Sequence, residues 1–252
     1  MTPRLTLVQY PGLDPGTTLS PPCAKVHMAL RWKRLTYDVI DLTAPWQVKR
    51  YNSRGRVPIL LVDGSTVVDS TDILTELDRR FPEPRWTPRD ARDATEAKIL
   101  EDWADEVLYF YGLYLRWCVP ENVERMRAVA FGRLPWPARW IVPPLAIREV
   151  RRRARGQGVG LKDRATVERE FDECLNAIES LLEGRSWLAG TDPSRADLAV
   201  GAVIDQLRIL RLTPRVAHRI DARPSLRAWL DRLRTLVPSV AERPPESSPR
   251  PD

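Results

Sequence analysis

The chain has 252 residues, of which 43% are apolar, and it carries a formal net charge of +6. This length and composition suffice for one large or two modest domains with a packed core. We find no apolar run long enough to span a bilayer and no signal peptide at the start, and three scattered cysteines argue against a disulfide framework and for a reducing, cytoplasmic compartment.

The first part of the chain predicts alternating strands and helices. Strand patterns cover residues 5–9, 36–42, 59–62 and 66–68, and helix patterns cover residues 21–33, 44–51 and 70–81. Asp63-Gly64 between the last two strands is a strong hairpin signal. The order β-α-β-α-β-β-α predicts a small mixed sheet with helices on its faces.

Beyond residue 81 the pattern changes. Three prolines in residues 82–90 stop any helix and make this segment the best linker candidate. Helices are expected over residues 94–117, 164–182, 195–212 and 225–236, whereas residues 135–144, with four prolines, should break the helical pattern. The chain therefore divides into a domain at 1–81, a linker at 82–90, an all-helical domain at 91–237 and a disordered tail at 238–252.

The segment around the hairpin carries a recognisable combination of motifs. Val57-Pro58 enters a strand, the hairpin follows, and the acid–serine pair Asp69-Ser70 opens a helix. In this order the motifs resemble the thioredoxin-like half of the cytosolic glutathione transferases. The alternative is a hairpin followed by an ordinary capped helix.

That resemblance implies a role for each residue of the segment. The main chain of Val57, beside a cis Pro58, would bind the cysteinyl part of glutathione in the manner of a paired strand. Asp69 and Ser70 would bind the γ-glutamyl end, because a helix N-terminus favours a carboxylate and an acid favours an amino group. Arg56 matches the position from which related proteins bind the glycine carboxylate, and its alternative is a surface arginine.

A second motif lies in the helical half. Residues 187–200 read Trp-Leu-Ala-Gly-Thr-Asp-Pro-Ser-Arg-Ala-Asp-Leu-Ala-Val, which resembles the helical-domain signature of the same family, with Ser194 and Asp197 at capping-box spacing. The resemblance covers residues 5–236 and is weakest over 119–160, where it is similar to a bacterial subgroup near the metaxin and failed-axon-connections proteins. It implies the glutathione transferase fold, a thioredoxin-like βαβαββα domain followed by a helical bundle.

Three residues compete for the activation of a bound thiol. Ser20, in Ser20-Pro21-Pro22-Cys23, could donate a hydrogen bond to the glutathione thiolate or could cap the following helix, and one oxygen cannot do both. Cys23 could form a mixed disulfide with glutathione or be a small buried helix residue. Tyr10 follows the first strand, where other transferase classes place a tyrosine hydroxyl, but it could equally pack on the surface.

The resemblance implies an enzyme that conjugates glutathione, its co-substrate, to a small apolar electrophile. Ser20 would activate the thiol, and aromatic residues of helix 94–117 would line the electrophile pocket. A homodimer is implied, and neither a metal nor a nucleotide is needed. Two other functions stay open: a glutathione-dependent thiol-disulfide transferase that uses Cys23, and a non-catalytic interaction protein with the same fold.

The basic residues concentrate in one run, Arg148 to Arg155, which reads Arg-Glu-Val-Arg-Arg-Arg-Ala-Arg. No nucleic-acid motif accompanies it and no aromatic residues interleave it, so no nucleic-acid partner is expected. We interpret the run as a solvated helix face, with transient contact at an acidic lipid surface as the lesser alternative and no stable membrane insertion.

Overall fold

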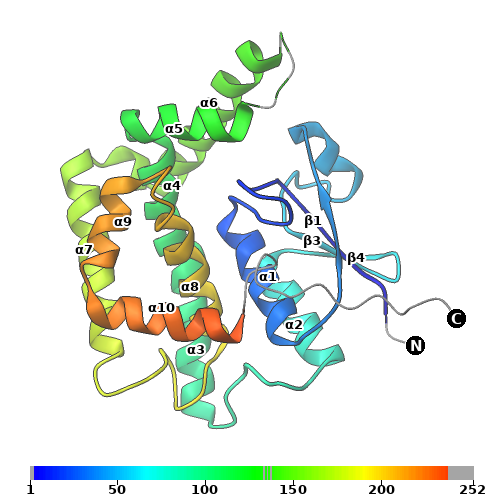
Figure 1. Cartoon of the computed structure of the whole chain (residues 1–252), viewed down its shortest axis with the longest axis vertical. Helices are drawn as coiled ribbons and strands as arrows, with labels where there is room; N and C mark the ends of the chain where they lie inside the picture. Colours follow the sequence, from blue (N-terminus) through cyan, green and yellow to red (C-terminus); the bar gives the residue numbers. More distant parts are fainter. Residues whose placement is uncertain (1–2, 133, 135, 137, 238–252) are drawn as a thin grey trace, which may run out of the picture.

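The computed structural model describes residues 3–132, 134, 136 and 138–237. The expected tail at 238–252 lies outside the described residues. A four-stranded sheet with covering helices forms the first part of the molecule, and helices form the rest (Figure 1). The expected fold class, a thioredoxin-like domain followed by a helical domain, is therefore confirmed.

The sheet has the strand order β2-β1-β3-β4, with β2 parallel to β1 and the other pairs antiparallel. The strands are β1 (Leu5–Gln9), β2 (Asp38–Asp41), β3 (Ile59–Val62) and β4 (Ser65–Val68). Asp63 and Gly64 both have positive φ, 50° and 86°, as a two-residue hairpin turn requires. The second strand is shorter than the expected 36–42, because β1 offers paired residues only opposite 38–41.

Helices cover both faces of the sheet, and they are α1 (Pro21–Trp32), α2 (Ser70–Arg80) and the 3₁₀ helix η1 (Pro45–Arg50). Leu7 and Leu60 point to one face and pack in the same core cluster as residues of α1 and α2. Val8 and Ile59 point to the other face, where they pack with Val48 of η1. This alternation is the period of two that a strand imposes on its side chains.

The helical domain is organised around α8, whose residues from Ala196 to Ile204 are all buried. Its helices are α3 (Ala91–Trp103), α4 (Tyr109–Trp117), α5 (Pro120–Phe131), α6 (Ala138–Gln157), α7 (Arg164–Leu181), α8 (Arg195–Leu207), α9 (Pro214–Asp221) and α10 (Pro224–Leu236), with a short 3₁₀ helix η3 (Val159–Leu161). The expected capping box is present at the start of α8. The N–H of Ser194 donates to the Asp197 carboxylate (2.8 Å), and the N–H of Ala196 donates to the Ser194 hydroxyl (3.2 Å).

The expected helix over residues 195–212 was wrong in its second half. α8 ends at Leu207, whose carbonyl accepts a hydrogen bond from the Thr213 hydroxyl (2.7 Å). Pro214 then opens a separate helix, α9, in the first-turn position that tolerates a residue without an N–H. The apolar period continues across this turn, which is why the sequence pattern did not mark the break.

The expected break over residues 135–144 was also wrong in part, because α6 begins at Ala138 and runs through Pro143 and Pro144. Each proline removes one intrahelical hydrogen bond. Pro143 is buried, and α6 contacts α4 and α5, so tertiary packing offsets those losses. The tryptophans expected in the interrupted segment therefore lie before and within the first turn of a helix.

The expected single helix over residues 94–117 contains a π-helical turn, η2 (Ala104–Leu108), between α3 and α4. A π-helical turn takes up one more residue than an α-helical turn. The side chains of α4 are therefore rotated about the helix axis relative to the positions that a continuous α-helix from α3 would give them. No local sequence signal marked this turn.

Candidate functional site

Three segments converge at one end of the sheet. Val8 of β1 lies opposite Ile59 of β3, and Ile59 lies opposite Val68 of β4. Because β1 and β4 end where β3 begins, the loop after β1, the residues before β3 and the start of α2 meet there. These segments, with the first turn of α1, contain all the predicted site residues: Tyr10, Ser20, Cys23, Arg56, Val57, Pro58, Asp69 and Ser70.

Ser20 occupies the N-cap position of α1. Its carbonyl accepts a hydrogen bond from the N–H of Ala24 (2.9 Å), and its own N–H donates to the Thr18 hydroxyl (3.2 Å). The Ser20 side chain makes no capping hydrogen bond. The side chain thus does not adopt the plain capping role that competed with thiol activation.

The loop between β1 and α1 is a closed structure. The N–H of Gly12 donates to the carbonyl of Thr17 (2.8 Å), and the Thr18 hydroxyl donates to the carbonyl of Tyr10 (2.9 Å). A Cβ at Gly12 would lie 2.6 Å from the main chain at Thr17, so this approach requires glycine. These contacts hold both ends of the loop together beneath Ser20.

Arg116 of α4 fixes the end of this loop and was not among the residues selected from the sequence. Its buried guanidinium donates to the carbonyl of Leu19 (2.8 Å) and to the carbonyl of Gln206. Burial lowers the pKa of Arg116 to about 10. An arginine between Leu115 and Trp117, in an otherwise apolar turn, is the sequence signal that could have revealed it.

Cys23 lies in the first turn of α1 and is fully buried. Burial raises the pKa of its thiol to about 12, although the hydroxyls of Ser20 and Thr18 act in the opposite direction. A thiol with this pKa is protonated at neutral pH, and the thiolate is the reactive form. The site therefore agrees with the interpretation of Cys23 as a small buried residue that packs behind Ser20.

The Val57–Pro58 peptide bond is cis, as the family resemblance implied. Among the described residues, none makes a hydrogen bond with the N–H or the carbonyl of Val57. The carbonyl of Arg56 accepts a hydrogen bond from the Asn52 side chain (2.8 Å), which holds this segment in place. Val57 thus presents a free main-chain edge beside the end of β1, and the Arg56 side chain is exposed next to it.

Asp69 and Ser70 form the junction between β4 and α2. Asp69 has φ of 80°, a conformation that costs a non-glycine residue roughly 1–3 kcal/mol and is concentrated at functional sites. One oxygen of its carboxylate accepts a hydrogen bond from the N–H of Thr71 (2.9 Å). Ser70 is buried at the first position of the helix, where unpaired N–H groups attract an anion.

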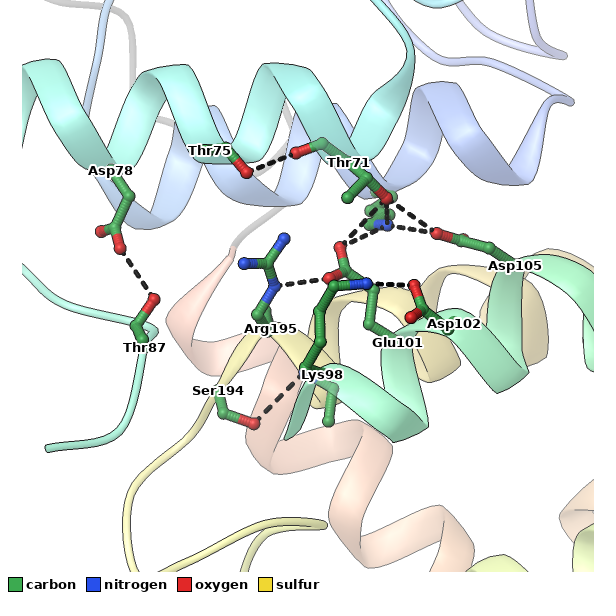
Figure 2. Close-up of polar contacts among 12 residues, drawn as sticks. Thr71, Thr75, Asp78, Thr87, Lys98, Glu101, Asp102, Asp105, Ser194 and Arg195 are labelled. Carbon is green, nitrogen blue, oxygen red and sulfur yellow. Dashed lines mark hydrogen bonds and ion pairs between the residues drawn. The ribbon is translucent and has the colours of Figure 1, made fainter. Parts of the chain in front are cut away.

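A buried ion cluster connects this junction to the helical domain. The ammonium of Lys25 in α1 lies 2.7 Å from the Glu101 carboxylate of α3 and 2.6 Å from the Asp105 carboxylate of η2. The hydroxyl of Thr71 lies between them, and Arg195 of α8 reaches the second oxygen of Glu101 (Figure 2). Burial raises the pKa of Asp105, and the charge of Lys25 opposes that shift. The cluster fixes the residue that follows Ser70.

The charge of Arg153 influences the pKa of two tyrosine hydroxyls, those of Tyr10 and Tyr109. Burial raises the pKa of Tyr10; the Cys23 thiol acts in the same direction and the guanidinium of Arg153 in the opposite one. Burial also raises the pKa of Tyr109 in α4, where Arg153 and then Arg56 oppose the shift. Arg153 of α6 therefore lies within electrostatic reach of both hydroxyls. It was missed in the sequence because it stands among other arginines without a distinguishing neighbour.

The other aromatic residues of α4 have different surroundings. The Tyr111 hydroxyl donates to the Glu170 carboxylate of α7 (2.9 Å), and its hydrogen-bonding capacity is used inside the helical domain. A cavity of about 170 Å³ lies beside this ring, lined also by Val107, Gly158 and Lys162. Among the aromatic residues expected on helix 94–117, Tyr109 is the one whose pKa is influenced by residues of the converging segments, Arg56 and Cys23.

The comparisons with known proteins agree with this arrangement. The profile of the glutathione S-transferase N-terminal domain matches residues 15–85, and that of the C-terminal domain matches residues 142–236. The chain belongs to the glutathione S-transferase superfamily. Between them, the two matches leave out residues 86–141, which include the end of the linker region, α3, η2, α4 and α5.

Individual relatives of this transferase-family chain are distant. It is 22% identical over 209 residues to Failed axon connections of Drosophila melanogaster, with 77% of this chain and 47% of that protein covered. It is 37% identical over 120 residues to Protein LigF of Sphingobium sp. strain SYK-6, with 46% of this chain and 43% of that protein covered. The matched regions thus span less than half the length of these curated relatives.

A solved structure resembles the chain over nearly its whole length. FzlA from C. crescentus superposes with a TM-score of 0.63 at 22% identity, covering 96% of this chain and 94% of that one. At this identity the likeness supports the fold alone. Together with the family matches, it assigns the converging segments to the thioredoxin-like half of the glutathione transferase fold.

Proposed function

We propose that the protein binds glutathione at the converging end of the sheet. The free main chain of Val57 supports an antiparallel pairing with the cysteinyl residue of the tripeptide. The N-terminus of α2 at Ser70 suits the γ-glutamyl carboxylate, and the second carboxylate oxygen of Asp69 suits the γ-glutamyl amino group. The exposed Arg56 suits the glycine carboxylate, which a guanidinium binds in bidentate geometry.

We propose further that Ser20 activates the thiol of the bound glutathione. The observation that carries this proposal is the Ser20 hydroxyl, which stands at the N-terminus of α1 and makes no capping hydrogen bond. A hydroxyl there donates a hydrogen bond to the thiolate, and the helix dipole also favours the negative sulfur. Lowering the thiol pKa from ~8.5 by about two units, roughly 2.7 kcal/mol, makes the bound thiol mostly ionised at neutral pH.

The reaction that follows is a nucleophilic displacement. The glutathione sulfur uses its electron pair to form a bond with an electrophilic carbon. The bond from that carbon to its leaving group breaks, and the leaving group departs with the electron pair and takes up a proton. Tyr109 and Arg153 suit a leaving group that becomes negative, because the Arg153 guanidinium acts electrostatically on the hydroxyls of both Tyr10 and Tyr109.

The local identity to LigF bears on the substrate class. A solved LigF structure describes that protein as a β-etherase. We propose that the electrophile includes a carbon bonded to an ether oxygen, so that the leaving group departs as an oxyanion. An aryl ether and a chloroarene of similar size, assayed side by side, distinguish this preference from general conjugation.

The thiol-disulfide function is disfavoured by the site. Cys23 is inaccessible, and its raised pKa keeps it protonated at neutral pH. With serine at position 20, no second thiol stands near it for a dithiol cycle. Mass spectrometry after treatment with glutathione disulfide is expected to leave Cys23 unmodified, and an adduct on Cys23 would instead establish this alternative.

The decisive experiment compares wild type with Ser20→Ala and with the exposed control Ser65→Ala. Calorimetry is expected to give unchanged affinity for S-methylglutathione in all three proteins, because the methylated sulfur needs no activation. The kcat/KM for conjugation is expected to fall about 10²-fold in Ser20→Ala alone, about 2.7 kcal/mol. Absence of S-methylglutathione binding in wild type favours the non-catalytic interaction protein. An unchanged kcat/KM in Ser20→Ala contradicts the proposed activation of the thiol by Ser20.

Two broader expectations accompany this function. The homodimer implied by the family is a proposal that sedimentation velocity tests directly. The cytoplasmic compartment is also a proposal, and the three free cysteines support it because free thiols persist in a reducing environment.

A further inference from the structure

One helix of the molecule exposes apolar side chains in a row. In α6, Trp140, Ile141 and Leu145 are 59%, 58% and 60% exposed, although residues of this kind are usually buried. The preceding Trp136 is 72% exposed as well. The start of α6 lies at the top of the molecule, beyond the other helices (Figure 1). This outward apolar group has no role in the fold or in the glutathione site.

The same face of α6 continues as a row of arginines. At 3.6 residues per turn, Arg148, Arg151, Arg152 and Arg155 follow Trp140, Pro144 and Ile141 on one side of the helix. All four arginines are exposed. Among the described residues no carboxylate pairs with Arg148, Arg151 or Arg155, whereas Arg152 pairs with Glu149 (2.8 Å). Pro143 and Ala154, which lie away from this row, are buried.

The exposed face of α6 is therefore divided along its length. We define the apolar tip as Trp140, Ile141, Pro144 and Leu145, and the basic shaft as Arg148, Arg151, Arg152 and Arg155. From Trp140 to Arg155 the helix rises about 22 Å. Aromatic and aliphatic residues thus precede the basic run on one surface, although residues 148–155 themselves contain no aromatic residue.

We propose that the exposed face of α6 docks the protein reversibly on a membrane surface that contains anionic phospholipid. Such a surface presents an apolar phase and, above it, negatively charged headgroups. A tryptophan-bearing apolar tip enters the boundary between the headgroups and the acyl chains, and arginines bind the headgroup phosphates. No helix of the described residues is long and apolar enough to cross a bilayer, so the contact is peripheral.

A second copy of the chain fits this face poorly. In an antiparallel pairing of two α6 helices, the basic shaft of one copy would lie on the apolar tip of the other, and its charges would lose water without gaining partners. In a parallel pairing, four arginines would face four arginines. Charge complementarity therefore favours a partner that is apolar at one depth and negative at another.

Vesicle flotation tests the proposal with the full chain. Wild type is expected to float with phosphatidylcholine vesicles that contain phosphatidylglycerol and to stay behind with phosphatidylcholine alone. Arg148→Gln with Arg155→Gln is expected to weaken partitioning about 25-fold, roughly fivefold per charge. Ile141→Ser with Leu145→Ser is expected to weaken it at least about tenfold. The control pair Ile99→Ser with Arg227→Gln, exposed on α3 and α10, is expected to change nothing.

A conservative tryptophan-to-phenylalanine substitution distinguishes a loss of lipid contact from a loss of folding. In vesicles with brominated acyl chains, tryptophan emission of wild type is expected to be quenched, and Trp136→Phe with Trp140→Phe is expected to lose most of that quenching while still floating. Absence of flotation on both vesicle types overturns the proposal. Retained binding in Ile141→Ser with Leu145→Ser also overturns it, since the contact would then be electrostatic alone. A wild-type dimer that this variant converts to monomers without lipid assigns the face to a second copy instead.

Discussion

The end of the sheet and the exposed face of α6 use their side chains in opposite ways. At the end of the sheet, apolar side chains such as Ile59 point inward, and among the described residues no partner takes up the main-chain hydrogen-bonding groups of Val57. On α6, apolar side chains such as Trp140 point outward. The first arrangement places a few polar atoms on a rigid support. The second gives up burial that would stabilise the fold, and it implies that these side chains are covered by something outside the chain.

The largest expected effect comes from the buried ion cluster behind the site. Lys25→Met leaves the carboxylate of Asp105 without its cation and that of Glu101 with Arg195 alone, and it is expected to lower the free energy of unfolding by roughly 3–5 kcal/mol. Lys98→Met removes an exposed ion pair with Asp102 and is expected to cost below about 1 kcal/mol. Urea denaturation of both variants measures the difference. Equal losses would contradict the assignment of the cluster as a support for the junction at Ser70.

The second largest effect is the dependence of the free energy of unfolding on pH, through His27. His27 of α1 is buried, its Nε2 lies 2.7 Å from the Gln9 side chain and its Nδ1 lies 2.8 Å from the Tyr37 hydroxyl. Burial lowers its pKa from 6.5 to about 3. Because the unfolded chain binds the proton first, this stabilisation is complete above pH 6.5 and is lost as the pH falls towards 3.

The size of this effect is roughly 3 kcal/mol between pH 6.5 and pH 4. Equilibrium unfolding of wild type and of His27→Gln over this range isolates it, and the stability of the variant is expected to decline less steeply with acid. The exposed His218→Gln serves as the control. If wild type and His27→Gln lose stability in parallel, His27 is not held neutral by the fold.

The smallest expected change in the free energy of unfolding comes from the exposed face of α6, and it contrasts with the change expected at the end of the sheet. Trp140→Ser with Ile141→Ser replaces two large side chains and is expected to change the free energy of unfolding by less than about 0.5 kcal/mol, because both are exposed. Ile59→Ser, on the inward face of β3, is expected to cost several times more. Thermal denaturation compares the two. A large loss in the first variant would mean that the exposed face of α6 is covered within the molecule.

The sequence predicted the sheet domain well, because its signals are local. Asp63-Gly64 determines the hairpin, Pro58 and Ser70 bound their elements, and Ser194 with Asp197 caps α8. These motifs also carry the family resemblance. The roles assigned to Ser20, Val57 and Asp69 remain predictions.

The remaining features depend on contacts between distant residues. Arg116 reaches a carbonyl almost a hundred positions earlier in the chain, and Arg153 approaches Tyr10 only because α6 folds back along α4. The π-helical turn has no local sequence signature, and the exposure of Trp140 follows from the packing of α6 as a whole. Such features are set by the completed fold.

The π-helical turn η2 determines how far α4 is rotated about the helix axis relative to α3. It carries Asp105, which joins the ion cluster around Thr71, and directly after it comes Tyr109, whose pKa rise through burial is opposed by the charges of Arg153 and Arg56. Return of this turn to regular α-helix with the sequence unchanged would rotate every later side chain of α4 by about 100°, whereas deletion of one residue would remove the wide turn and leave those side chains on their present faces. The width of this one turn therefore determines which side chain of α4 lies at the position of Tyr109, without any change in the sheet.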